Sequence, residues 1–232
     1  MVVNMLDICR FQAAQKALNH VKNGIVLGLG TGSTVAVFIE LLAKMVKSTG
    51  LNIKCVATSY QSEHLAVDFG LNVLPLESFS CIDLAVDGAD EVDSRMVLIK
   101  GGGAALTREK VVASMAKEYI VIVDYSKLSS KIGEKKPVPI EVLPYAWRYV
   151  MKKIEKLNGK PYLRSGGEYK DGPIVTDNGN FIVDAYFGVI NDPEELEYRI
   201  NSIAGVVECG LFVGLAKRIY VGYPDRVDEM LK

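Results

Sequence analysis

Two hydrophobic periodicities alternate along the first 125 residues of the chain. Stretches in which apolar residues recur every three or four positions are typical of amphipathic helices, and short continuous apolar runs are typical of buried strands. The pattern predicts helices over residues 6–21, 34–46, 62–69 and 104–116, and strands over residues 25–29, 53–57, 71–76, 82–86, 97–99 and 120–123. This alternation indicates an open parallel β-sheet with helices on both faces.

The pattern changes after residue 131, where a lysine- and proline-rich segment leads into a second series of elements. The series is a strand at residues 140–142, a helix at 145–157, strands at 162–164 and 181–187, a helix at 194–203 and a strand at 206–209. This β-α-β-β-α-β order is that of a ferredoxin-like domain. The last apolar run, residues 218–222, most simply returns to the first sheet. We therefore predict an α/β protein in which residues 1–131 and 210–232 form a Rossmann-like open-sheet domain and residues 132–209 an inserted ferredoxin-like domain.

Composition and charge exclude several classes of protein. The chain has 232 residues, and its 27 Lys and Arg nearly balance its 28 Asp and Glu, so nothing indicates a nucleic-acid or membrane-surface partner. There is no uncharged apolar stretch of about 18 residues and no signal-peptide pattern at the N-terminus. The four cysteines are far apart and form no CxxC pair, which predicts reduced thiols and no structural zinc; they are Cys9, Cys55, Cys81 and Cys209. We expect a cytoplasmic protein.

Candidate chemistry lies where the predicted strands end, because open parallel sheets bind ligands beyond the carboxyl ends of their strands. The first such end, residues 28–34, is rich in glycine and hydroxyl groups. It lacks the third glycine of a dinucleotide fingerprint, where Ser33 stands, and the Gly-Lys-Ser/Thr of a Walker A loop. The N–H groups of the following helix favour an anion such as phosphate. Alternatively, the glycines serve only a tight strand-to-helix turn.

Acidic residues and a lysine follow two later strands. Asp87, Asp90 and Glu91 lie close together in the sequence, and Lys100 ends the next predicted strand. An ammonium group competes with a metal ion, so this set favours acid–base groups with an oxyanion partner over a divalent-metal site. A solvated acidic turn and a metal site remain the alternatives.

Three successive glycines, residues 101–103, come next and favour a ligand that approaches the backbone closely. Glu109 lies within about two turns of the start of the following helix, and its charged neighbours taken alone favour a surface residue. The two histidines, His20 and His64, fall on predicted helices away from the glycine turns and are not candidate catalysts.

Several stretches together match a known family in their order. They are Gly28-Leu-Gly-Thr-Gly-Ser-Thr34, Asp87-Gly-Ala-Asp-Glu91, Lys100-Gly-Gly-Gly-Ala-Ala-Leu-Thr-Arg-Glu-Lys110, Ser126-Lys127, Val175-Thr-Asp-Asn-Gly-Asn180, Gly210-Leu-Phe212 and Val221-Gly-Tyr-Pro224. With these motifs the chain resembles type A ribose-5-phosphate isomerases over nearly its whole length. The resemblance implies a Rossmann-like catalytic domain with an α/β insertion. It also implies interconversion of D-ribose 5-phosphate and D-ribulose 5-phosphate, in the non-oxidative pentose phosphate pathway, with no metal or organic cofactor.

The resemblance also implies roles for particular residues. Glu109 is then the base that moves a proton between C1 and C2 through an enediolate, which replaces its interpretation as a surface residue. Lys100 and the glycine amides stabilise the oxyanion, and Asp87 and Asp90 handle hydroxyl protons, Asp87 also assisting ring opening. The implied substrate-binding residues are Thr31, Gly32, Ser33, Thr34, Asp87, Gly88, Ala89, Asp90, Lys100, Gly101, Gly102, Gly103 and Lys127. Of these, the turn at residues 31–34 and Lys127 are expected to hold the phosphate.

The chain departs from the family pattern at two places. Arg10 stands where members often carry lysine, and residues 210–216, Gly-Leu-Phe-Val-Gly-Leu-Ala, replace a Gly-Leu-Phe followed by polar residues. Related folds include sugar-phosphate deaminases, CoA transferases and sugar-phosphate sensors. A deaminase is expected to use a histidine. A CoA transferase is expected to use a nucleophilic glutamate, for which Glu109 is available, and a sensor is expected to carry an additional DNA-binding module. The apolar run at residues 181–187 indicates a homodimer or homotetramer contact, although one buried sheet face explains it equally well.

Overall fold

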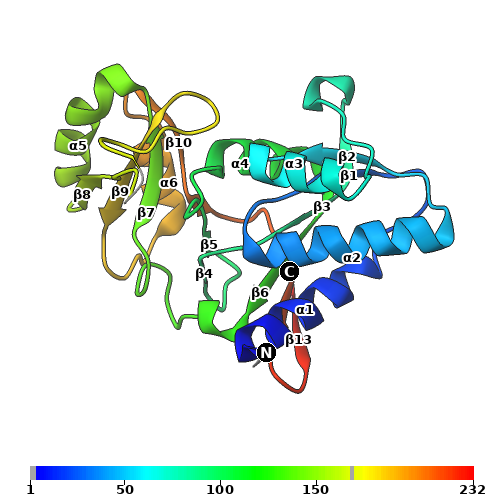
Figure 1. Cartoon of the computed structure of the whole chain (residues 1–232). Helices are drawn as coiled ribbons and strands as arrows, with labels where there is room; N and C mark the ends of the chain where they lie inside the picture. The colour runs from blue at the N-terminus through cyan, green and yellow to red at the C-terminus, as the bar shows by residue number, and fades with distance from the viewer. Residues whose placement is uncertain (1–3, 168–169) are drawn as a thin grey trace. The chain divides into compact units, whose positions relative to one another are not determined.

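The structure is a computed structural model that describes residues 4–167 and 170–232 (Figure 1). The contacts within the chain divide it into two compact units. Unit 1 comprises Met1–Ala89, Arg108–Lys127 and Gly214–Lys232, and unit 2 comprises Asp90–Thr107 and Leu128–Val213. The chain therefore passes from unit 1 into unit 2 twice.

Unit 1 is built on a six-stranded sheet. Its strands are β1 (Val26–Leu29), β2 (Lys54–Ala57), β3 (Ile82–Asp87), β6 (Ala116–Asp124), β12 (Arg218–Gly222) and β13 (Val227–Leu231). Their order is β13-β12-β6-β3-β1-β2, and all neighbours are parallel except β13, which pairs antiparallel with β12. The predicted parallel sheet is confirmed, and the run at residues 218–222 returns to it as expected.

Helices cover both faces of this sheet. They are α1 (Met5–Leu18), α2 (Ser33–Thr49), α3 (Tyr60–Asp68) and α4 (Leu106–Met115), and α1 and α2 lie side by side (Figure 1). Leu27 and Leu29 of β1 belong to the same buried cluster as Phe38 of α2. Gly28 points the other way, because successive strand residues face opposite sides, and a Cβ there would lie 2.4 Å from Cγ1 of Val112 in α4. Helices α2 and α4 therefore pack on opposite faces.

Unit 2 contains a four-stranded antiparallel sheet with two helices. Its elements are β7 (Val138–Val142), α5 (Trp147–Glu155), β8 (Lys160–Leu163), β9 (Phe181–Tyr186), α6 (Pro193–Asn201) and β10 (Val206–Cys209). The strand order is β10-β7-β9-β8, so the first and third strands lie in the centre. Ile154 of α5 and Ile200 of α6 pack in one core with Ile140 and Val183 of the central strands. These elements follow the order predicted for a ferredoxin-like fold.

A third, small sheet was not expected. It joins β4 (Glu91–Val92), β5 (Leu98–Ile99) and β11 (Leu211–Phe212), all antiparallel, in the order β11-β5-β4. The prediction that residues 97–99 add a strand to the parallel sheet is wrong, because a three-residue apolar run does not specify its partner. Residues 90–107 consequently group with unit 2, whereas the sequence placed them with the open sheet.

Two smaller differences concern unit 1. Residues 71–76 were predicted as a strand, but they form a single bridge between Val73 and Cys55, followed by a 3₁₀ turn at Leu76–Ser78. Strand β13 was not predicted, since its exposed edge position lets polar residues interrupt the apolar pattern. None of the described helices has the length and apolar character needed to cross a membrane. The four cysteines, all within the described residues, form no disulfide, and three of them are buried.

Candidate active site

Unit 1 brings the carboxyl ends of β1 and β3 together around Asp87. Asp87 is the last residue of β3, and only 2% of it is exposed. Its Oδ1 accepts hydrogen bonds from the N–H groups of Gly88 (2.7 Å) and Thr31 (3.2 Å). A Cβ on Gly30 would lie 2.0 Å from that oxygen, so only glycine allows this approach. The carboxylate is thus oriented by backbone groups at the edge of the sheet.

The hydroxyl of Thr31 does not lie where the phosphate hypothesis expects it. It donates to Ser59 Oγ (2.7 Å) and shares a 2.9 Å hydrogen bond with Thr58 Oγ1, both beyond the end of β2. Helix α2 then begins at Ser33, and its N-cap residue, Gly32, has a φ of 103° and provides no side-chain cap. The first N–H groups of a helix lack intrahelical partners and carry the positive end of its dipole. The start of α2 is therefore an anion-attracting end at the same edge as Asp87.

The end of β6 carries Lys127 and the buried carboxylate of Asp124. The 3₁₀ turn Tyr125–Lys127 follows the strand directly, and the N–H of Ser126 donates to Asp124 Oδ1 (3.0 Å). Arg10 of α1 donates through Nε to Asp124 Oδ2 (3.4 Å) and through Nη1 to Asp7 (3.2 Å). The guanidinium of Arg10 is thus held by two carboxylates, whereas Lys127 is half-buried at the sheet edge.

Glu109 is a buried residue rather than a surface one. It lies in the first turn of α4, and 4% of it is exposed. The charged neighbours Arg108 and Lys110 favoured a surface position for Glu109, because a sequence does not show which face of a helix is covered. The interpretation of Glu109 as a surface glutamate is therefore wrong.

Tyr119, on β6, is a buried residue, and 1% of it is exposed. Its burial, followed by the negative charges of Asp87 and Glu109, raises the pKa of its hydroxyl well above the ordinary value of 10.0. The phenol stays protonated at neutral pH. The sequence did not reveal Tyr119, and its one signal was a hydroxyl within the apolar run of β6.

Unit 2 holds Lys100 directly after β5. Lys100 is 2% exposed, and its ammonium lies 5.5 Å from the centroid of the Phe212 ring. Its N–H donates to the carbonyl of Gly210 (2.9 Å), and a Cβ on Gly210 would lie 2.2 Å from the Lys100 carbonyl oxygen. The Gly-Leu-Phe motif at residues 210–212 therefore positions Lys100, and the unusual residues that follow it do not alter these contacts.

Contacts within the protein explain why two residues of the glycine run next to Lys100 are glycines. Gly101 has a φ of 101°, and a Cβ there would lie 2.8 Å from Leu106. The N–H of Gly102 donates to Asp90 Oδ2 (2.7 Å), and a Cβ on Gly102 would lie 2.7 Å from Asp90 Oδ1. Gly102 and Gly103 are exposed. The sequence predicted that a ligand approaches the backbone of the glycine run closely. At Gly102, the group that approaches the backbone is the carboxylate of Asp90.

The Thr-Asp-Asn-Gly-Asn motif at residues 176–180 surrounds a buried carboxylate. Glu141 of β7 is 0% exposed. Its Oε1 accepts hydrogen bonds from Thr176 Oγ1 (2.8 Å), Asn178 Nδ2 (3.0 Å) and Asn180 Nδ2 (2.8 Å), and its Oε2 from Thr107 Oγ1. Buried carboxylates require such partners. The motif thus has a structural purpose within unit 2, and it holds Thr107 at the start of α4.

The predicted site residues divide between the two units. Unit 1 contains Thr31, Gly32, Ser33, Thr34, Asp87, Gly88, Ala89, Glu109 and Lys127, and unit 2 contains Asp90, Lys100, Gly101, Gly102 and Gly103. The neighbouring Glu91 is buried and accepts the N–H groups of Lys135 and Lys136, so it holds a loop. The histidines lie elsewhere: His20 hydrogen-bonds to the hydroxyl of Tyr220 (2.8 Å), and His64 is exposed.

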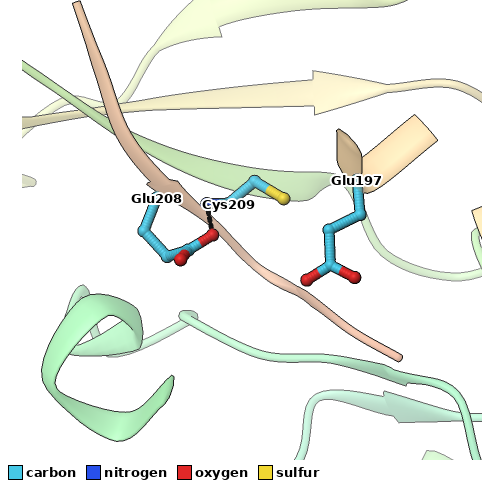
Figure 2. Close-up of side chains that lie close together, drawn as sticks. All are labelled: Glu197, Glu208 and Cys209. Carbon is cyan, nitrogen blue, oxygen red and sulfur yellow. Dashed lines mark hydrogen bonds between the residues drawn. The ribbon is translucent and has the colours of Figure 1, made fainter. Parts of the chain in front are cut away.

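One group of possible metal ligands lies outside these residues, on α6 and β10. Oxygen and sulfur atoms of Glu197, Glu208 and Cys209 lie within 4.8 Å of one another (Figure 2). Glu208 Oε1 accepts hydrogen bonds from Asn201 Nδ2 (2.6 Å) and from the N–H of Cys209 (2.8 Å), so this carboxylate folds back onto the chain. Among the described residues, no other group of three or more such side chains lies this close, and this one includes none of the predicted site residues.

Comparison with known proteins agrees with these features. Residues 54–226 match the family model of ribose 5-phosphate isomerase A, also called phosphoriboisomerase A. The ribose-5-phosphate isomerase A of Methanosarcina acetivorans is 51% identical over 90% of this chain and 88% of its own. That of Thermococcus kodakarensis is 50% identical over 94% of this chain and 95% of its own.

Solved structures agree in fold. The ribose 5-phosphate isomerase A of Methanocaldococcus jannaschii has a TM-score of 0.93 and 40% identity, covering 97% of this chain and 99% of that one. A D-ribose-5-phosphate isomerase in complex with phospho-erythronic acid has a TM-score of 0.95 and 44% identity, covering 98% and 99%. The chain belongs to the ribose 5-phosphate isomerase A family.

Proposed function

We propose that this protein interconverts D-ribose 5-phosphate and D-ribulose 5-phosphate through an enediolate, as a step of the non-oxidative pentose phosphate pathway. The observation that carries the proposal is the buried carboxylate of Glu109 in the first turn of α4, in a chain about half identical to isomerases of that name. The complex of a structural relative with phospho-erythronic acid, a sugar-acid phosphate, supports the substrate class.

The reaction needs a base for a carbon-bound proton. In the direction from the aldose, Glu109 removes the proton from C2, the C1 carbonyl becomes part of an enediolate, and Glu109 returns the proton to C1. One carboxylate serves both steps, because the enediolate is planar and a base over one of its faces reaches both C1 and C2. Burial supports this role, since a carboxyl group largely kept from water returns much of the proton to substrate before solvent replaces it.

The hydroxyl protons on O1 and O2 must also move. We assign these transfers to Asp87 and Asp90. Each carboxylate is oriented by backbone N–H groups, Asp87 by Thr31 and Gly88, and Asp90 by Gly102. Asp87 also takes the proton of the anomeric hydroxyl when the sugar ring opens. Positioned acid–base groups of this kind typically contribute about 10²–10⁴-fold each.

Negative charge develops on the enediolate oxygens, and positive groups are needed to stabilise it. Lys100 is buried and positioned against Phe212, and Gly102 and Gly103 are exposed. We assign oxyanion stabilisation to this ammonium and to the amides of the glycine run. Such groups act strongly when they are fixed before the charge appears.

The phosphate is assigned to the turn at residues 31–34 and to Lys127, with Gly88 and Ala89 completing the substrate-binding edge of unit 1. The uncapped start of α2 supports this assignment, as does the exposure of Ser33. Since the Thr31 hydroxyl is used within the protein, the hydroxyls of Ser33 and Thr34 and the helix N–H groups are the donors that we assign to phosphate.

Substitution of these phosphate ligands is expected to affect KM more than kcat. The phosphate is remote from C1 and C2, so its contacts stabilise substrate and transition state alike. Steady-state kinetics of Lys127→Ala and Thr34→Ala against ribose 5-phosphate test this, with Lys16→Ala, on the exposed surface of α1, as the control. An unchanged KM in both variants removes the turn and the lysine from the phosphate site.

The function itself is tested with purified protein in a coupled assay that detects ribulose 5-phosphate. We expect turnover without added metal and full activity in EDTA, because a lysine accompanies the acidic residues and no histidine or cysteine belongs to the assigned set. Loss of turnover in EDTA that a divalent ion restores overturns the metal-free mechanism. Absence of isomerase activity under all conditions overturns the proposed function.

We also propose a cytoplasmic homodimer or homotetramer. The apolar strand at residues 181–187 no longer supports an oligomer, because β9 is a central strand whose residues 182–185 are buried within unit 2. Support comes instead from Tyr162 and Tyr186, which stack at 6.0 Å and remain 42% and 47% exposed. Sedimentation equilibrium, which gives the mass as a multiple of 25.4 kDa, tests the oligomer.

A further inference from the structure

We propose that Arg164 is a positioning residue for the isomerase reaction, which orients the peptide groups of the glycine run and, through Gly102, the carboxylate of Asp90. The inference rests on the proposed function, in which these groups stabilise and protonate the intermediate. Arg164 belongs to none of the motifs that mark the family in this sequence, and all the contacts that support its role lie within unit 2.

The guanidinium of Arg164 is fixed by a buried carboxylate. Arg164 follows β8, and its Nε and Nη2 donate to Asp184 Oδ2 (2.6 Å) and Oδ1 (2.5 Å). Asp184 lies on the central strand β9, and its side chain is 4% exposed, against 16% for that of Arg164. A two-pronged bond of this kind fixes the plane of the guanidinium as well as its position. Arg164 is therefore a rigid donor in a defined direction.

The remaining nitrogen of that guanidinium is bound to the glycine run. Nη1 donates to the carbonyl oxygens of Gly101 (2.9 Å) and Gly102 (3.0 Å). In a planar trans peptide, a carbonyl and the N–H that follows it point in opposite directions, and the described chain has no cis peptide bond. Arg164 therefore turns the N–H groups of Gly102 and Gly103 away from itself.

The direction of the first of these N–H groups is observed. The N–H of Gly102 donates to Asp90 Oδ2 at 2.7 Å. Asp90 and Gly102 also line, together with Arg164, one pocket of about 290 Å³ in unit 2. Arg164 thus acts on Asp90 through one peptide group, and the same bond geometry sets the direction of the Gly103 N–H.

Glycines make this external support necessary. Without side chains, residues 101–103 have more accessible backbone conformations than any other tripeptide, and Gly101 is already in the left-handed region. Rotation of either peptide would present a carbonyl oxygen, the negative end of the dipole, where negative charge develops. Because preorganised donors lower the barrier more than they strengthen substrate binding, loss of Arg164 should appear mainly in kcat.

The test compares Arg164→Ala and Arg164→Lys with Arg95→Ala. Arg95 is a matched control in the same unit, since it also pairs with a buried aspartate, Asp93 (2.9 Å), and donates to a backbone carbonyl, that of Asn191 (3.1 Å). The readouts are kcat, KM for ribose 5-phosphate, and inhibition by phospho-erythronic acid. The carboxylate of that compound places negative charge at the end remote from the phosphate, as the enediolate does.

Both Arg164 variants are expected to lose about 10- to 100-fold in kcat, somewhat less than the effect of deleting an oxyanion donor outright. Inhibition by phospho-erythronic acid should weaken by a similar factor, while KM changes less than about threefold because ground-state contacts remain. The lysine variant should not recover activity, since an ammonium cannot bond both Asp184 oxygens in one plane. Added guanidinium ion should partly restore Arg164→Ala and leave Arg95→Ala unchanged.

Other results overturn the inference. If KM of Arg164→Ala rises as much as its kcat falls, Arg164 is a direct substrate ligand. If Arg164→Lys is fully active, Arg164 contributes only a positive charge. If Arg164→Ala does not fold, Arg164→Lys alone decides. Hydrogen exchange at the Gly102 N–H separates the inference from the proposed function. This exchange should be faster in the Arg164 variants but not in Arg95→Ala, even if the wild type proves not to be an isomerase. Unchanged exchange in the Arg164 variants refutes the positioning role.

Discussion

Replacement of Glu109 by glutamine should lower kcat by about 10²–10⁴-fold, the usual contribution of a positioned base, while substrate still binds. Glutamine keeps the shape and the hydrogen-bonding capacity of the side chain but cannot take a proton from carbon. Glu109 is buried in unit 1, and because glutamine is nearly the same size, the amide fits the same space. The fold should therefore survive, and the loss should fall on chemistry.

Steady-state kinetics with Glu118→Gln as control measure this effect. Glu118 precedes Tyr119 on β6, but its side chain is 38% exposed and pairs with Arg218. The wild type in D₂O should also place deuterium at C2 of the aldose or C1 of the ketose in part of the product, because the protonated carboxyl exchanges with solvent in some turnovers before it returns its proton to carbon. Near-normal kcat for Glu109→Gln refutes the assigned role. If the wild type takes up no deuterium but Glu109→Gln loses its activity, the base is shielded from solvent. Hydride transfer from C2 to C1 is then the alternative mechanism to exclude.

Replacement of Lys100 by methionine should lower kcat by about 10²–10³-fold, the effect of removing a preorganised oxyanion donor. Methionine has a similar length and remains apolar against Phe212, so the change removes the charge and little packing. Lys100 is 2% exposed, and charges act more strongly on one another where water is excluded. The effect on kcat should exceed that on KM, because the opposing charge appears in the transition state.

Lys117→Met is the matched control, since it removes a lysine paired with Asp83 (2.7 Å) outside the assigned residues. Thermal unfolding of Lys100→Met, compared with that of the wild type, separates loss of the charge from loss of the fold. Equal kcat in Lys100→Met and Lys117→Met contradicts the oxyanion role. Loss of activity that tracks a lower unfolding temperature instead makes Lys100 a structural residue.

Periodicity was sufficient for the larger elements of this protein. Helices and strands longer than about four residues carry an apolar pattern of their own, which is why both main sheets and their helices were predicted. The strand at residues 97–99 was assigned to the wrong sheet, and β13 was missed, because short or edge strands take their definition from a partner rather than from their own pattern. The grouping of residues 90–107 with unit 2 was not predicted for the same reason.

The site shows a similar division. The motifs included every residue to which a role in the reaction is assigned except Arg164, and they also missed the buried Tyr119. The resemblance gave the motif residues their chemistry. The sequence did not show that Glu109 is buried, that the Thr31 hydroxyl is bound to Thr58 and Ser59, or that Gly102 faces Asp90. Each of these facts depends on which chain segments meet.

The amino-acid sequence by itself therefore determined the fold class, the family and the list of chemical groups, because these follow from periodicity and motifs along the chain. Only the tertiary structure decided which groups are free to act. It buried Glu109, bound the Thr31 hydroxyl to Ser59, and bound Arg164 to the carbonyls of Gly101 and Gly102. The physical reason is that burial and the direction of a hydrogen bond depend on partners distant in sequence. Arg164 and the glycine run are more than 60 residues apart, and nothing in either segment specifies the other.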